Sequence, residues 1–203
     1  MSTAIEVLQQ AGRFTREVLL PLNAPGDRQG CRLEGGRVCT PNGFPAAWRA
    51  YVDACWPALS CDPHWGGQGL PRLLDVALGE MVNATNHAWN MYAGILHGAY
   101  ETVKAHGSDD LKARYLSRLA SGEWLSAMAL TEPQAGSSLA DVQTKATPTP
   151  DGHYLITGNK VFISGGDHDF ADNIVHLALA RIEGAPAGTR GISLFVVPKK
   201  RME

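Results

Sequence analysis

The sequence predicts an α+β protein, with an N-terminal all-α helical domain over residues 1–124 and an antiparallel β-domain over residues 125–203. Three observations support this prediction. Apolar residues recur with helical periodicity as far as residue 119. After Gly122 they gather instead in short runs rich in Ile, Val, Leu and Phe. The segments do not repeat one another, and none has low complexity.

The composition is that of an ordinary soluble protein. Of the 203 residues, 44% are hydrophobic and 19% are charged, and the formal net charge is -2. This charge argues against a dedicated nucleic-acid or membrane-surface binder. No apolar stretch approaches the roughly 20 residues that span a bilayer, and residues 1–6 lack the pattern of an export signal. We therefore expect a cytoplasmic protein with no membrane or nucleic-acid partner.

The four cysteines, Cys31, Cys39, Cys55 and Cys61, do not follow a common zinc-binding pattern. Cys61 and His64 are close in sequence, but a zinc site would need two more ligands from elsewhere. Without an export signal, we expect reduced thiols and no metal.

The first half predicts helices separated by turns. Thr3 and Glu6 form a capping box for a helix that Pro21 ends, and residues 23–43 are rich in turn formers. The elements expected next are a hairpin over 31–39, a short helix over 46–55, a loop over 56–71, helices over 73–106 with a break near 83–87, and a helix capped by Ser108.

The second half predicts strands. They are expected over 126–131, 153–157, 160–164, 173–181 and 191–197. Gly158-Asn159, between two of these runs, is a strong hairpin signal. The last strand ends near the C-terminus, and a sheet of this size keeps an open edge, which whole proteins usually cover. We therefore expect a truncated β-domain.

Two segments share a pattern typical of a flavin site. In residues 127–138 an apolar strand ends at the hydroxyl of Thr131, and a proline turn leads to Gly136, Ser137 and Ser138. In residues 160–166 a run with an aromatic side chain again ends at a hydroxyl, followed by two glycines. Such segments place polar edges and a closely approaching backbone against a flat cofactor.

The segment Leu130-Thr131-Glu132-Pro133-Gln134-Ala135-Gly136-Ser137 resembles the signature of the acyl-CoA dehydrogenase family. Lys160–Ser164 is similar to the second flavin segment of that family, and Trp65–Gly69 to its Tyr-Gly-Gly loop. The resemblance covers essentially the whole chain. Residues 21–31 and 56–60 most resemble the long-form branch that includes 3-methylmercaptopropionyl-CoA dehydrogenases.

The resemblance implies a helical domain, a middle β-domain and a C-terminal four-helix domain, the last absent from these residues. It also implies FAD as cofactor, an acyl-CoA substrate, an electron-transfer flavoprotein as electron acceptor and a homo-oligomer when full length. The reaction would be α,β-dehydrogenation, with the β-hydride passing to flavin N5. The base of the family is a Glu of the C-terminal domain, so we assign no catalytic residue here and expect the 203 residues alone to be inactive.

The resemblance also assigns the cofactor-binding residues. Thr131 would bond the flavin near N5 and O4, and Ser137 would reach the cofactor phosphates or the substrate pantetheine. Phe162 stands where many members carry Trp, Ser164 replaces a Thr, and Ser138 stands where Asp is frequent. The full set of cofactor-binding positions is Met128, Ala129, Leu130, Thr131, Gly136, Ser137, Phe162, Ile163 and Ser164.

Other titratable residues have simpler interpretations. Glu132 is expected to order a turn rather than act as a base, and Asp167-His168-Asp169 to form a solvated loop rather than a metal site or proton relay. His87 and His97 are expected to be packed or exposed rather than catalytic, and His106 to end a helix. Gly94 and Gly98 are expected to leave room at the floor of a substrate pocket.

Two alternative functions remain open from the sequence. One is a non-catalytic protein of the same fold that binds nucleic acid or acts in stress. The other is a structural module that has lost flavin, against which the three hydroxyls of Thr131, Ser137 and Ser164 argue.

Overall fold

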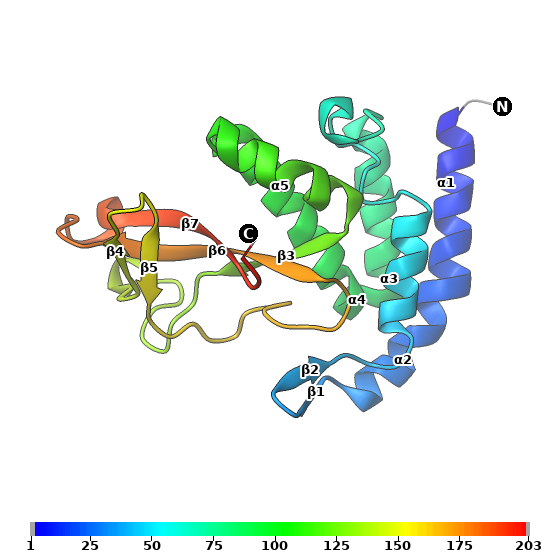
Figure 1. The fold of residues 1–203 in the computed structure, drawn as a ribbon. Coiled ribbons are helices and arrows are strands. Elements are labelled where there is room, and N and C mark those ends of the chain that lie inside the picture. The colour runs from blue at the N-terminus through cyan, green and yellow to red at the C-terminus, as the bar shows by residue number, and fades with distance from the viewer. Residues whose placement is uncertain (1–2, 202–203) are drawn as a thin grey trace. The chain divides into compact units, whose positions relative to one another are not determined.

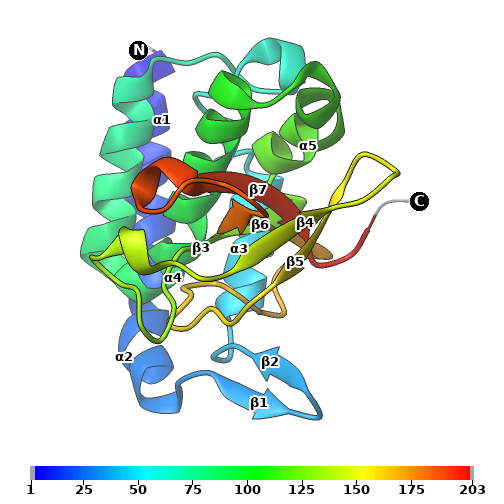
Figure 2. The same ribbon diagram turned by 90° about the vertical axis from the view of Figure 1, so that its left-hand side faces the viewer.

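The computed structural model describes residues 3–201, and Figures 1 and 2 show it from two sides. Its helices are α1 (Thr3–Phe14), α2 (Leu20–Gln29), α3 (Phe44–Asp53), α4 (Arg72–His106) and α5 (Asp109–Ser121), with short helical turns η1 (Thr15–Leu19), η2 (Pro63–Trp65), η3 (Leu139–Asp141) and η4 (Thr189–Gly191). Its strands are β1 (Arg32–Glu34), β2 (Arg37–Cys39), β3 (Trp124–Ala129), β4 (Lys145–Pro148), β5 (Tyr154–Thr157), β6 (Asn173–Ile182) and β7 (Ile192–Pro198).

The chain forms two compact units. The helical unit comprises residues 1–125 and 167–173, and the sheet unit comprises residues 126–166 and 174–203. An α+β class is therefore confirmed. The described residues include no helix long and apolar enough to cross a membrane.

The helical unit begins with a helical run that passes the residue predicted to end it. The π-helical turn η1 links α1 to α2, and Pro21 lies in the first turn of α2. The expected stop at Pro21 is wrong because a proline in the first turn of a helix removes no hydrogen bond that the helix needs. The helix instead ends at Gly30, which has a φ of 63°. The predicted hairpin at 31–39 is confirmed as β1 and β2.

The centre of the helical unit is a cluster of aromatic side chains. Trp48 packs against Tyr51, Trp89 and Phe170, with ring centroids 5.5, 5.6 and 6.2 Å away. The Trp89 indole is fully buried and donates a hydrogen bond to the carbonyl of Phe44. These contacts bury α3 against α4 and fix residues 167–173 to the same core.

The predicted break between the helices of 73–106 is confirmed as a kink within α4. Asn86 has non-helical angles and is fully buried. Its amide donates to the carbonyl of Leu19 at 3.3 Å and its carbonyl accepts from the N–H of Trp89 at 3.0 Å. The side chain therefore caps the second half of α4 and ties it to η1. The next helix, α5, packs on α4 and is capped by Ser108 as predicted.

The sheet unit holds a mixed sheet rather than a purely antiparallel one. Its strand order is β3-β6-β4-β5, and β7 also pairs with β6. The pairs β4–β5 and β6–β7 are antiparallel, whereas β4 runs parallel to β6 through Lys145 and Ala146. Strands β3 and β7 begin and end within two residues of the strands predicted over 126–131 and 191–197.

The predicted hairpin at Gly158-Asn159 is wrong. The strand Tyr154–Thr157 pairs with β4, before it in the chain, through a turn that contains Gly152 at a φ of 79°. Residues 158–166 form no strand. A Cβ on Gly158 would clash with the hydroxyl of Thr144, so this glycine serves close packing rather than a hairpin turn. Asp151-Gly152 is a turn signal of equal strength, and it forms the hairpin.

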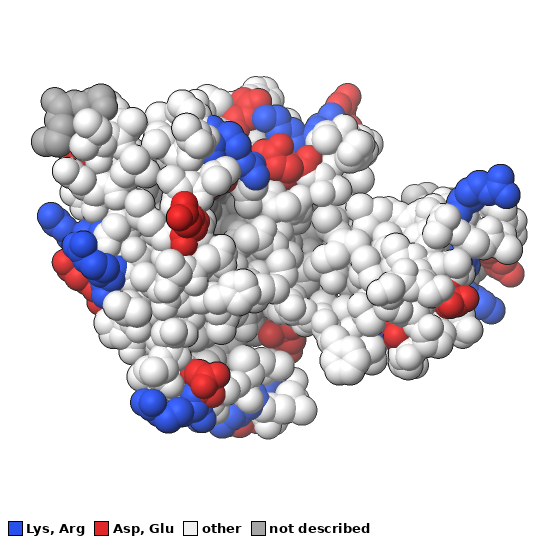
Figure 3. Space-filling model, turned by 180° about the vertical axis from the view of Figure 1, so that it is seen from behind, with Lys and Arg blue, Asp and Glu red and all other residues white. Residues whose placement is uncertain are grey.

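Charged side chains do not form a single-sign patch on the face drawn in Figure 3, where Lys and Arg lie among Asp and Glu.

Candidate functional site

The first predicted flavin segment leaves β3 and enters a tight turn. Glu132 and Ala135 exchange two backbone hydrogen bonds of 2.8 and 3.0 Å. Thr131, just before this turn, is half-buried, and its hydroxyl makes no hydrogen bond to the described residues. Gly136 and Ser137, just after it, are exposed, and a Cβ on Gly136 would meet nothing within 4 Å. The segment therefore presents an open hydroxyl and open backbone.

Glu132 is the electrostatic centre of this turn. The carboxylate is 4% exposed and accepts hydrogen bonds from Lys160 Nζ at 2.8 Å, from the backbone N–H groups of Gln143 and Thr144 at 2.8 and 3.1 Å, and from the Gln134 amide at 2.6 Å. Burial alone would raise the pKa of Glu132, but these hydrogen bonds outweigh it and lower the pKa to about 2. A carboxylate this acidic is a poor base, so the prediction that Glu132 orders a turn agrees with its contacts.

The second predicted segment lies beside the first. The N–H of Val161 donates to the carbonyl of Thr131 at 3.0 Å, and Lys160 Nζ donates to the carbonyl of Leu130 at 3.0 Å. Phe162 follows with a φ of 56° and a side chain that is 93% exposed. Ser164 is also exposed, and its hydroxyl makes no hydrogen bond to the described residues.

The structure thus brings together seven of the nine predicted cofactor-binding residues on two segments that are hydrogen-bonded to each other. These are Met128, Ala129, Leu130 and Thr131 on β3 and its exit, and Phe162, Ile163 and Ser164 on the adjoining loop. The hydrogen bonds of the described residues include none that ties Gly136 or Ser137 to that loop. The convergence of all three hydroxyls on one ligand therefore stays a prediction.

The sequence did not predict the contacts of two residues near these segments. Lys160 lies within the second segment, and its Nζ donates hydrogen bonds to the carbonyl of Leu130 and the carboxylate of Glu132. His176 lies in the middle of β6, and its Nε2 is 2.8 Å from the carbonyl oxygen of Gly166. A lone histidine inside an apolar run of strand residues was the available signal.

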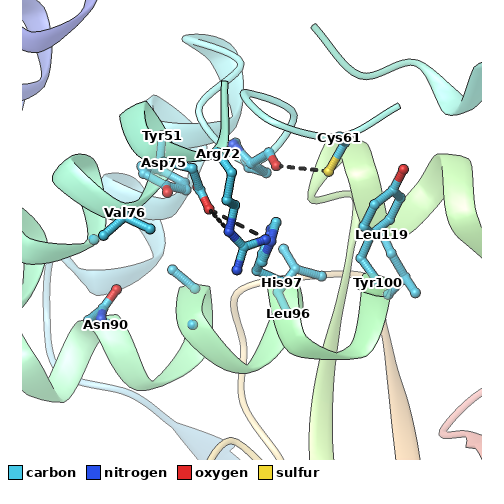
Figure 4. Close-up of a pocket in the computed structure, with 14 residues that line it drawn as sticks. Tyr51, Cys61, Arg72, Asp75, Val76, Asn90, Leu96, His97, Tyr100 and Leu119 are labelled. Carbon is cyan, nitrogen blue, oxygen red and sulfur yellow. Dashed lines mark hydrogen bonds and ion pairs between the residues drawn. The ribbon is translucent and has the colours of Figure 1, made fainter. Parts of the chain in front are cut away.

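A second feature lies wholly within the helical unit. A cavity of about 210 Å³ separates the two halves of α4, as Figure 4 shows. Gly79 and Gly94 line it, and a Cβ on Gly79 would meet nothing within 4 Å, while one on Gly94 would meet only the Asn90 amide at 3.9 Å. Of the two glycines expected at a pocket floor, Gly94 lines this cavity and Gly98 does not.

Charged side chains form one end of the cavity. In Figure 4, Arg72 and His97 both point to Asp75, with Arg72 Nε and His97 Nε2 at 3.5 and 3.7 Å from Asp75 Oδ2. Burial lowers the pKa of His97 and Arg72 adds to this, although Asp75 and Glu101 act in the opposite direction. On another wall, burial raises the pKa of the Cys61 thiol to about 12 and keeps it protonated.

The segment Asp167-His168-Asp169 is not the solvated loop expected. His168 is 5% exposed and packs its ring on Tyr92 and Phe170, while Asp169 accepts two hydrogen bonds from Thr40. The segment is not solvated because the rings of His168 and Phe170 pack in the aromatic core of the helical unit. Among residues 3–201, no group of three or more His, Cys, Asp or Glu side chains could hold a metal ion. His87 is exposed, and His106 is the last residue of α4 as predicted.

Comparison with known proteins decides the family. A sequence profile of the acyl-CoA dehydrogenase N-terminal domain matches residues 3–123, and one of the middle domain of the same family matches residues 127–203. The chain belongs to the acyl-CoA dehydrogenase family. The predicted resemblance is thereby confirmed for both halves of this dehydrogenase-family chain.

Curated relatives agree with this assignment. The chain is 45% identical to the 3-methylmercaptopropionyl-CoA dehydrogenase of Ruegeria pomeroyi over 98% of its own length and 34% of that protein. It is 34% identical to the broad-specificity linear acyl-CoA dehydrogenase FadE5 of Mycobacterium tuberculosis over 98% of its length and 33% of that protein. This acyl-CoA dehydrogenase chain thus spans about a third of the length of the curated relatives it matches.

Solved structures share the fold. An acyl-CoA dehydrogenase from Bacillus anthracis, complexed with FAD, matches with a TM-score of 0.78 at 24% identity, covering 98% of this chain and 31% of that one. The butyryl-CoA dehydrogenase of Megasphaera elsdenii matches with a TM-score of 0.77 at 22% identity, covering 98% and 49%. At these identities the likeness supports the dehydrogenase fold alone.

Proposed function

We propose that this chain supplies the flavin-facing part of an FAD-dependent acyl-CoA dehydrogenase that oxidises an acyl-CoA thioester between its α and β carbons. One observation carries the proposal. The hydrogen bond from Val161 to Thr131 joins the two segments that the family motifs occupy, and both end in open hydroxyls. The division at residues 124 and 125 and a C-terminal four-helix domain outside these residues belong to the same proposal.

The residues present fit a flavin. β3 is an end strand of its sheet, so one row of its backbone donors and acceptors is left unpaired by strands. Met128 is 37% exposed on this strand, and Phe162 offers a highly exposed ring for stacking. When bound, FAD would supply the acceptor for a hydride from the substrate. Thr131 would donate a hydrogen bond to the ring edge where negative charge develops, and Gly136 and Ser137 would contact phosphates or pantetheine.

The partners follow from the same proposal. The substrate is an acyl-CoA thioester. The electron acceptor is an electron-transfer flavoprotein, and the complete enzyme is a cytoplasmic homo-oligomer of fatty acid metabolism. The 45% identity to a 3-methylmercaptopropionyl-CoA dehydrogenase supports the acyl-CoA substrate.

Removal of the Thr131 hydroxyl tests the cofactor site. FAD titrated into the chain should bind, and Thr131→Val should weaken binding up to about tenfold, because a hydrogen bond to the neutral edge of the oxidised ring contributes about 0.5–1.5 kcal/mol. Thr147→Val is the matched control, since Thr147 is an exposed strand residue of the same unit. Equal FAD affinity in Thr131→Val and wild type would contradict the assignment.

Turnover tests the absence of a base. The 203 residues alone should not reduce an artificial electron acceptor with butyryl-CoA, because we assign the base to a domain outside them. The R. pomeroyi relative serves as the positive control with its own substrate. Robust turnover by the chain alone would place a base among its own residues. If the full-length protein is colourless, and so lacks flavin, and retards DNA in a gel-shift assay, the non-catalytic alternative would be favoured.

A further inference from the structure

The loop of residues 161–165 holds an aromatic residue in a conformation that few aromatic residues adopt. Phe162 has a φ of 56°, in the left-handed region, which costs a non-glycine residue on the order of 1–2 kcal/mol. Its ring is 93% exposed, so packing of the ring does not offset that cost. The conformation must therefore be held by bonds at the two ends of the loop.

The first end of the loop is hydrogen-bonded to the residues that follow β3. The N–H of Val161 donates to the carbonyl of Thr131, and Lys160 Nζ bridges the carbonyl of Leu130 and the carboxylate of Glu132. Glu132 is itself held by backbone N–H groups of residues 143 and 144. This end is consequently tied to two other segments of the sheet unit.

The second end of the loop is bonded to the sheet by a histidine. Gly166 closes a turn by donating to the carbonyl of Ile163 at 3.1 Å, and its own carbonyl lies 2.8 Å from His176 Nε2. His176 Nδ1 lies 3.2 Å from the carbonyl of Val197, its cross-strand partner on β7. Both oxygens only accept hydrogen bonds, and the shorter distance assigns the donated proton to Nε2.

We propose that His176 is a positioning residue that holds loop 161–165 against β6, and so presents Phe162 and Ser164 to the cofactor. The anchoring stands on the geometry of the sheet unit alone. Only its consequence for FAD rests on the function proposed above. The flavin motifs do not include this histidine, and it touches neither Phe162 nor Ser164 in the contacts of the described residues.

Hydrogen exchange tests the anchor without cofactor. In His176→Val, which keeps a strand-forming side chain, the Gly166 amide should exchange at least about tenfold faster, while amides of the β4–β5 hairpin keep their wild-type rates. His176→Gln should restore slow exchange, since its amide can donate to the same carbonyl. His153→Val, an exposed histidine of the same unit, is the control. Unchanged exchange at Gly166, or equal acceleration in the hairpin, would overturn the proposal.

Two further measurements test the proposal independently of hydrogen exchange. In wild type, nitrogen-15 NMR should find a proton on His176 Nε2, and a ring protonated on Nδ1 alone would overturn the anchor even if His176→Val does not fold. FAD affinity should fall about tenfold in His176→Val and recover in His176→Gln, and equal affinities would overturn the positioning role. If wild type binds no FAD, the proposed function of this chain fails, whereas exchange at Gly166 still decides the anchor.

Discussion

Each of the two units of this protein is held together internally by a different kind of contact. In the helical unit the largest buried side chains are aromatic and aliphatic, with Trp48, Trp89 and Leu78 each no more than 2% exposed. In the sheet unit the loops are held largely by side chains that donate hydrogen bonds to backbone carbonyls, whereas in the helical unit such contacts, from Asn86 and Trp89, lie within the buried core. Arg181 donates to the carbonyls of Ala140, Val142 and Gly188 at 2.6–2.7 Å, and His176 and Lys160 make similar contacts.

This difference indicates how each unit is stabilised. Apolar burial is non-directional and scales with area, so it stabilises helices without fixing the orientation of individual groups. Hydrogen bonds from these half-buried side chains are directional, and they satisfy loop carbonyls that pair with no strand. The helical unit should therefore respond chiefly to changes in volume, and the sheet unit to changes in charge and hydrogen bonding.

The largest expected effect is a loss of volume in the helical unit. Leu78→Ala should lower the free energy of unfolding by about 2–5 kcal/mol, because Leu78 is 1% exposed and its truncation leaves a cavity. Leu73→Ala, in the same half of α4 but 76% exposed, should change it by less than about 0.5 kcal/mol. Urea unfolding followed by tryptophan fluorescence measures this, since all five tryptophans lie in the helical unit. Equal losses in both variants would break the comparison.

A smaller effect should appear in the sheet unit on acidification. The folded-state pKa of Glu132, about 2, lies below its ordinary value of 4.5, so its ionised form stabilises the fold above pH 4.5 and this stabilisation is lost as the pH falls toward 2. Between pH 5 and pH 2, wild type should lose about 2–3 kcal/mol more than Glu132→Gln. Urea unfolding followed by circular dichroism at each pH measures the difference.

Glu183→Gln is the control for this pH dependence, because Glu183 is an exposed carboxyl of the same unit. Its curve should follow wild type. If Glu132→Gln also follows wild type through this range, the hydrogen bonds to Glu132 do not stabilise the carboxylate, and the contrast between the units loses its main support.

The sequence was sufficient for most of the fold because its elements carry local signals. The hydroxyl of Ser108 before two aspartates and the apolar run of β6 specify a helix start and a strand without reference to distant residues. The errors arose where a local signal had a tertiary competitor. Pro21 is compatible with a first helical turn, and Gly158 is required for contact with Thr144 rather than for a hairpin.

The site was predictable only where the motif itself contains the candidate residues. The hydroxyl and glycine pattern was sufficient to select Thr131 and Ser164, which the structure leaves open. The anchors could not be found in this way, because Lys160 and His176 act through contacts with residues 28 and 10 positions away. A pairing at that separation depends on the register of strands, which no local pattern specifies.

The smallest expected effect returns to the helical unit, at His97 and its charged neighbours. Burial lowers the pKa of His97, so the unfolded chain takes up a proton near pH 6.5 before the folded protein does, and wild type should lose stability as the pH falls below 6.5. His97→Gln should remove this loss, while His87→Gln, at an exposed histidine, should keep it. The effect is small because Asp75 and Glu101 partly offset burial. Urea unfolding between pH 7.5 and 5 measures it. If wild type instead gains stability relative to His97→Gln as the pH falls, the two carboxylates dominate, and the helical unit would depend on charge as the sheet unit does.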